Sequence, residues 1–156
     1  MNIKRVRALC EAKPGSTMDY PFGPEDRVYK VGGKVFAFLS EAAPWQVSLK
    51  CDPELARILR ERCAAVKAPR YLNKQLWNLI QLDGSVPDEE IVELISHSSD
   101  LVVAKLPKAL RTRLLDPAVP ASSRGARAAK LPARNKRKAA GAQGRKQKPH
   151  SRRADR

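Results

Sequence analysis

The side chains best suited to bind an anionic partner gather near the C-terminal end of the chain. Twelve lysines and arginines are spaced among alanine, glycine, glutamine and proline between residues 124 and 153. They are Arg124, Arg127, Lys130, Arg134, Lys136, Arg137, Lys138, Arg145, Lys146, Lys148, Arg152 and Arg153. Cations on a flexible chain bind a polyanion by releasing its condensed counterions, and they read no base sequence. This composition predicts binding to nucleic-acid phosphates, and the alternative is a solubilising terminal extension.

Charge divides the chain into two parts. The 156 residues have a net charge of +15, which excludes an ordinary acidic cytosolic enzyme. Residues 1–110 hold 16 basic and 14 acidic groups, whereas residues 111–156 hold 15 and 2. All aromatic residues precede residue 80, and a segment so poor in apolar area cannot offset its backbone entropy. We therefore predict one folded domain over residues 1–110 and a disordered basic tail over residues 111–156.

Four lysines of the domain are candidates for a second basic surface. Lys30, Lys34 and Lys50 alternate out of the expected strands, and Lys74 precedes a further strand. A two-stranded ribbon fits the major groove of DNA, where such lysines contact phosphates or guanine edges. The alternative is a set of ordinary solvated lysines on the open face of a sheet, since the domain itself is almost neutral.

Catalytic and metal-binding patterns are missing from the sequence. Cys10, Cys51 and Cys63 fall on apolar faces, where a thiol acts as a small hydrophobe with a raised pKa. His97 has no second ligand at metal-binding spacing, and His150 lies in the tail. We find no phosphate-binding glycine loop and no nucleophile motif. The sequence thus predicts a non-enzymatic protein with no catalytic residue, no metal and no cofactor.

One acidic cluster has two explanations. Asp88, Glu89, Glu90 and Glu93 begin an expected helix. Acids at a helix N-terminus are stabilised by the helix dipole, which explains them more simply than a metal does.

The elements that position these side chains follow from hydrophobic period and turn residues. Apolar residues at helical spacing predict helices, and β-rich runs joined by Gly32-Gly33 predict a hairpin with a primed turn. Asp52 and Pro53 are typical of a helix start. We expect helices over residues 2–12, 52–65 and 88–106, strands over 27–31, 34–39, 45–51 and 76–82, an ordered turn over 19–26, and a short strand near Tyr71.

This order predicts an α+β fold of two layers. The sheet is antiparallel and covered on one side, and Trp45 and Trp77 are expected in the core. The longest apolar run is far shorter than the roughly 20 residues of a membrane span, so no membrane association is expected.

Several strings in this order resemble the MmcQ/YjbR family of small bacterial proteins. They are residues 19–24 (DYPFGP), 31–37 (VGGKVFA), 49–53 (LKCDP), 73–78 (NKQLWN) and 100–107 (DLVVAKLP). The resemblance implies a two-layer fold, comparable with frataxin-like and secretion-chaperone-like folds, and a double-wing mode of DNA binding through hairpins. Relatives carry histidines where this chain has Tyr71 and Leu76, so any role of those histidines is absent here.

The functional expectation combines both parts of the chain. It is a nucleic-acid-binding protein, with DNA preferred over RNA, monomeric when unbound and located in the cytoplasm or on the nucleoid. The alternative is a protein-binding adaptor or chaperone-like module whose folded domain does not bind nucleic acid.

Overall fold

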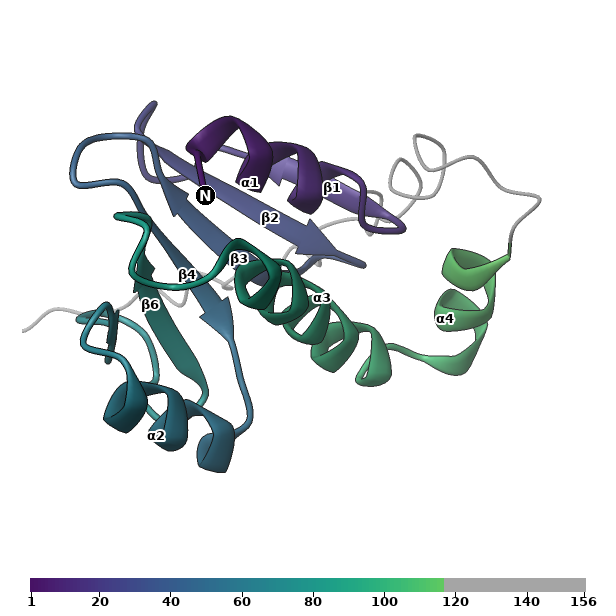
Figure 1. The fold of residues 1–156 in the computed structure, drawn as a ribbon. Coiled ribbons are helices and arrows are strands. Elements are labelled where there is room, and N and C mark those ends of the chain that lie inside the picture. Colours follow the sequence, from purple (N-terminus) through teal and green to yellow (C-terminus); the bar gives the residue numbers. More distant parts are fainter. Residues whose placement is uncertain (117–156) are drawn as a thin grey trace, which may run out of the picture.

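The computed structural model describes residues 1–116, which form a mixed helix and sheet domain (Figure 1). The α+β class expected from the sequence is confirmed, and so are the expected helices at residues 3, 53 and 88. The elements are α1 (Ile3–Glu11), β1 (Ser16–Asp19), β2 (Asp26–Val31), β3 (Lys34–Ser40), β4 (Gln46–Lys50), α2 (Pro53–Arg62), β5 (Val66–Lys67), β6 (Trp77–Gln81), α3 (Asp88–Ala104) and α4 (Lys108–Leu115).

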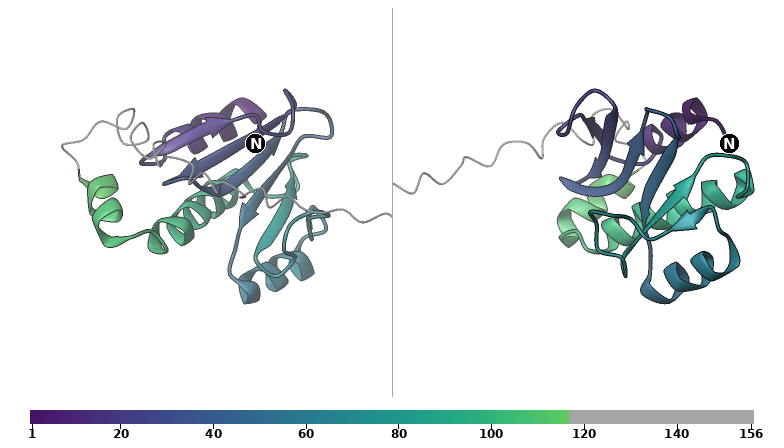
Figure 2. Two further views of the ribbon diagram at one scale, coloured as in Figure 1. Left: turned by 180° about the vertical axis from the view of Figure 1, so that it is seen from behind. Right: turned by 90° about the vertical axis from the view of Figure 1, so that its left-hand side faces the viewer.

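The six strands form one antiparallel sheet in the order β1-β2-β3-β4-β6-β5. Helices α1, α2 and α3 pack on one face of this sheet (Figures 1 and 2). The opposite face is covered by none of the helices of residues 1–116, and we call it the uncovered face. The domain therefore has two layers, with its core between the sheet and the three helices.

The β2-β3 hairpin has the predicted two-glycine turn. Gly32 and Gly33 have φ angles of 56° and 79°, the positive values that this turn requires. Val31 pairs directly with Lys34 across the turn. Further along, pairing passes from Lys30 with Val35 to Tyr29 with Ala37, so β3 bulges at residue 36. The bulge buries both Phe36 and Ala37 against the helices.

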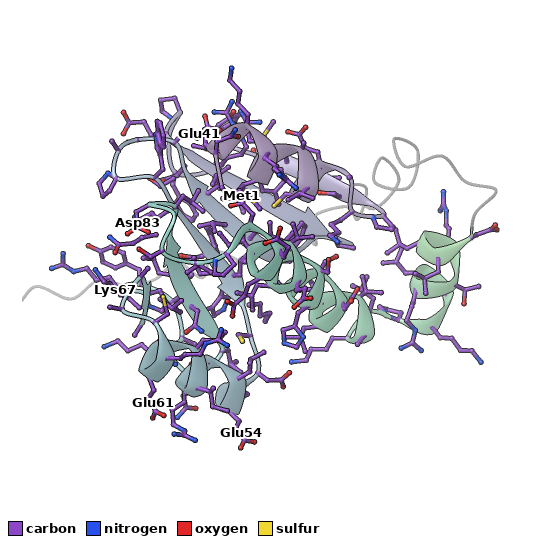
Figure 3. The ribbon with its side chains drawn as sticks, viewed as in Figure 1. Met1, Glu41, Glu54, Glu61, Lys67 and Asp83 are labelled. Carbon is purple, nitrogen blue, oxygen red and sulfur yellow. The ribbon has the colours of Figure 1, made fainter. Side chains whose placement is uncertain are left out.

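Helix α1 is joined to the sheet by an ion-pair network at its C-terminal end. Glu41, labelled in Figure 3, lies 2.6 Å from Nε of Arg27 and 2.7 Å from Nη2 of Arg7. Arg27 also lies 3.4 Å from Glu11 of α1. Arg27 and Glu41 are largely buried, so their pair is screened less than a surface pair, and Arg7 ties α1 to it.

Helix α2 starts where the sequence predicted it, with Pro53 in its first turn, but without a side-chain cap. Asp52 occupies the N-cap position, but its side chain accepts no capping hydrogen bond. Its Oδ2 lies 3.3 Å from Nε2 of His97 on α3. A contact between helices, formed only in the folded chain, has replaced the local cap.

Three other details correct the sequence predictions. Strand β1 begins at Ser16, before the turn expected over residues 19–26, and its mostly exposed side chains show no alternating pattern. The short fifth strand lies at Val66–Lys67 rather than near Tyr71, which is 89% exposed. Trp45 is 49% exposed and is not a core residue, because it precedes the first residue of β4, whereas Trp77 is buried, at 8% exposed.

The folded part also continues past the boundary predicted at residue 110. Helix α4 runs to Leu115, so the disorder predicted for residues 111–115 is wrong. The physical reason is a tertiary contact: Leu114 is buried and packs directly on Gly15 in the α1-β1 turn. Leu106 and Leu110 pack on Gly32 in the same way. The rest of the predicted tail, residues 117–156, lies outside the described residues. No helix within residues 1–116 is both long and apolar enough to cross a bilayer.

The docking of α4 can be tested at the hairpin turn. A Cβ on Gly32 would lie 2.8 Å from Leu106, whereas a Cβ on Gly33 would meet nothing within 4 Å. Both residues have positive φ, so both alanine variants suffer the same kind of backbone strain. We expect Gly32→Ala to lower the free energy of unfolding by about 1–3 kcal/mol more than Gly33→Ala, through overpacking. Urea denaturation measures both, and equal losses would show that Leu106 and Leu110 do not press on this turn.

Candidate nucleic-acid interface

The twelve basic residues predicted to bind phosphates in the tail lie outside the described residues. Their placement stays a prediction. The four candidate lysines of the domain are all described, and the structure separates them.

Lys30, Lys34 and Lys74 do not share a surface with one another. Because Val31 pairs with Lys34 across the turn, Lys30 and Lys34 point to opposite faces of the sheet. Lys30 lies on the uncovered face, where its Nζ is 3.1 Å from a carboxylate oxygen of Asp19. The hairpin thus presents no single row of lysines to a groove.

Lys34 and Lys50 instead lie near a third lysine, which was not among the four candidates. Lys105, at the end of α3, and Lys34 are close enough to Lys50 for their charges to act on it. The pKa of Lys50 lies below its ordinary value, first because the side chain is partly buried and then because of repulsion by Lys105 and Lys34. We call Lys34, Lys50 and Lys105 the lysine cluster. None of the three is paired with a carboxylate of residues 1–116.

Ser98 of α3 holds the backbone at this end of the sheet. Its Oγ accepts a hydrogen bond from the backbone N–H of Lys50 at 2.8 Å and donates one to the carbonyl oxygen of Phe36 at 2.5 Å. The hydroxyl thus fills the gap where β3 and β4 stop pairing, one residue beyond the Ala37–Leu49 pair. It fixes Lys50 relative to α3 and therefore to Lys105.

Helix α4 extends the positive charge away from the cluster. Residues 101–115 contain Lys105, Lys108, Arg111 and Arg113 and no acidic residue. This run of basic residues could have indicated Lys105 from the sequence, but it crosses the boundary predicted at residue 110 between domain and tail. Since Leu106 and Leu110 pack on Gly32, α4 starts beside the turn that carries Lys34 and then leads to residues 117–156.

Lys74 lies elsewhere, beside α2. Its carbonyl oxygen accepts a hydrogen bond from Nη2 of Arg60 at 2.7 Å. An open hollow of about 560 Å³ is found here, and Arg57 at its rim is already bound to both carboxylate oxygens of Glu61. The residues lining this hollow are Pro53, Arg57, Arg60, Glu61, Lys74 and Gln75. The structure therefore does not bring Lys74 to the lysine cluster.

A row of rings crosses the uncovered face. The ring centroid of Phe38 is 6.3 Å from that of Phe22 and 5.4 Å from that of Trp77. We call these three residues the aromatic row. Nζ of Lys50 lies 5.2 Å from the centre of the Trp77 ring, which is cation–π distance. The row therefore ends at the lysine cluster. No local pattern in the sequence predicts that the two lie side by side.

The acidic start of α3 is engaged in contacts with α1 and α2. The amino group of Met1 lies 2.5 Å from Asp88, and Arg5 lies 3.7 Å from the same carboxylate. Arg62 of α2 pairs with Glu90. Among residues 1–116, no group of three histidine, cysteine or carboxylate side chains is arranged to hold a metal ion.

Two of the three thiols are deeply buried, as expected from their strand and helix faces. Burial raises the pKa of Cys10 to about 12 and that of Cys51 to about 11. Such thiols are fully protonated at neutral pH, and a protonated thiol is a poor nucleophile. Cys63, at the end of α2, is partly exposed.

The comparison with known families tests the resemblance noted in the sequence. The family model described as YjbR matches residues 11–101. This chain belongs to the YjbR family. The matched residues include the aromatic row, Lys34, Lys50 and Ser98, whereas Lys105 and α4 lie beyond them.

Bacterial relatives agree with this assignment. The protein YjbR of Escherichia coli K12 is 36% identical over 116 residues, which cover 74% of this chain and 98% of that protein. The protein YbdF of Escherichia coli O157:H7 is 32% identical over 105 residues, which cover 66% and 85% of the two chains. Their names state no ligand and no activity.

Solved structures give the same fold. A crystal structure of the Deinococcus radiodurans protein DR2400, of domain family DUF419, is 32% identical and has a TM-score of 0.70, covering 78% of this YjbR-family chain and 94% of its own. A Pseudomonas syringae protein at 24% identity shares the fold with a TM-score of 0.59, covering 65% and 99% of the two chains.

Proposed function

We propose that this YjbR-family protein binds nucleic acid and is not an enzyme. Residues 117–156, which we call the basic segment, supply most of the affinity. The lysine cluster docks the domain on the same polyanion. Residues 117–156 hold 13 basic residues and one acidic residue, a composition that binds phosphates without reading sequence. DNA in the bacterial cytoplasm is the partner we favour, and the free protein is a monomer.

One observation carries this proposal. The lysine cluster brings three cations together without a carboxylate partner among the first 116 residues, and it does so beside the helix that leads to the basic segment. Like charges that repel one another in the free protein are stabilised when an anion is bound between them. A phosphate backbone that follows the basic segment to α4 reaches the cluster next.

Charge-neutralising variants of the full chain test the two parts separately. Replacing the twelve predicted tail residues with glutamine is expected to weaken duplex DNA binding by about 100-fold or more at low salt, since counterion release is lost. Lys34→Gln with Lys105→Gln should lower the slope of log affinity against log salt by about two, because each phosphate contact contributes about one. Gel shifts over a salt series measure both.

The matched control removes the same charge elsewhere. Lys4→Gln with Lys67→Gln also deletes two cations, and Lys67 lies on the side of the molecule opposite α4 (Figure 3). This pair is expected to leave the salt slope unchanged. Equal salt slopes for the two double variants would show that the lysine cluster does not contact the nucleic acid. Full affinity in the variant with a neutral tail would refute the proposal as a whole.

A further inference from the structure

Phe22, the most exposed residue of the aromatic row, lies in a turn bounded by prolines. Phe22 is 71% exposed and stands between Pro21 and Pro24, whose φ angles are fixed. The next turn, over residues 23–26, is closed by a hydrogen bond from the N–H of Asp26 to the carbonyl of Gly23, at 3.3 Å. Little conformational entropy remains to be lost when a ligand covers this ring, which favours binding.

The surroundings of the row combine flat apolar area with positive charge. Phe38 lies between Phe22 and Trp77, and Lys50 lies over Trp77 at the far end. Lys30 stands on the same face of the sheet. A ligand that places planar rings on this surface therefore has cations beside it for its negative groups. Nucleotides combine these two features.

A duplex does not fit this arrangement, because its base faces are stacked on one another. Nor is the β2-β3 hairpin a free ribbon that could enter the major groove, since β1 and β4 flank it on both sides. A single strand, in contrast, exposes base faces that stack on aromatic side chains while its phosphates meet lysines.

We propose that the uncovered face binds single-stranded nucleic acid, with a base stacked on Phe22 and a phosphate further along the strand at Lys50. This inference rests on the proposed nucleic-acid function and gives the domain a preference that the basic segment cannot supply. The basic segment holds either form by charge, and the aromatic row selects the unpaired one.

The test compares one DNA sequence in single-stranded and duplex form on the full chain. Phe22→Ala is expected to weaken single-strand binding by about 5- to 100-fold, the usual effect of losing one stacking platform, and to leave duplex binding within about twofold. Phe22→Trp should restore or improve single-strand binding. Tyr71→Ala removes an even more exposed ring that is outside the row, and it should change neither affinity. Fluorescence anisotropy of labelled oligonucleotides gives all the values.

A second measurement does not depend on affinity. With Trp45 changed to phenylalanine, Trp77 is the sole tryptophan. Single-stranded DNA is expected to quench its fluorescence, whereas duplex DNA is not. Equal loss of both affinities in Phe22→Ala, or no loss in either, overturns this inference while leaving the proposed function intact. Failure of the unaltered chain to bind either oligonucleotide refutes the proposed function itself.

Discussion

Binding of the full chain to duplex DNA is expected to weaken by about 10³- to 10⁵-fold between 50 and 200 mM salt, if six to ten of its cations contact phosphates. The reason is that salt reduces the entropy gained when condensed counterions leave the DNA. Residues 117–156 alone supply more than enough cations for this number of contacts. Gel shifts or anisotropy at five or six salt concentrations measure the slope.

The control for this experiment varies the temperature at fixed salt concentration, which leaves the number of ions released unchanged. A slope near zero would mean that affinity does not come from phosphate contacts. In that case the adaptor function, which uses the domain surface for a protein partner, would replace the one proposed here.

Ser98→Ala is expected to lower the free energy of unfolding by about 2–4 kcal/mol. The hydroxyl is fully buried and is bonded to two backbone groups, the N–H of Lys50 and the carbonyl of Phe36. Alanine removes the partner of both groups, and each unsatisfied buried group is costly. Urea denaturation of the full chain gives the value.

The neighbouring serine provides the control. Ser99 is also buried on α3 but is bonded to neither strand, so Ser99→Ala should cost about 1 kcal/mol or less. Losses of similar size for the two variants would show that the hydroxyl of Ser98 does not bridge β3 and β4. Ser98→Ala should also weaken the contribution of the lysine cluster, because Lys50 loses its tie to α3.

The parts of the fold that were predictable are those encoded locally. The Gly32-Gly33 turn, the alternation through Val47 and Leu49, and the Asp52-Pro53 start of α2 each lie within a few residues of one another. A two-residue turn pairs Val31 with Lys34, and this pairing alone places Lys30 on the opposite face.

The parts that were missed depend on contacts between distant residues. Helix α4 has only eight residues, and it is held by the contact of Leu114 with Gly15, almost a hundred residues earlier. Lys105 joins Lys34 and Lys50 only because α3 crosses β3 and β4, with Ser98 inserted between them. The aromatic row likewise collects its rings from a loop and two strands. The residue pattern within a single segment does not encode such contacts between distant segments.

The outer strands of the sheet have a consequence for colloidal behaviour. β1 has four residues and β5 has two, so each border offers few free backbone groups to a second molecule. Long, flat edge strands are where the sheets of separate molecules pair and grow into fibres, and short edge strands interrupt this growth. The protein can therefore leave the exposed Phe22 ring open to a ligand at high cellular concentration without its sheets pairing edge to edge.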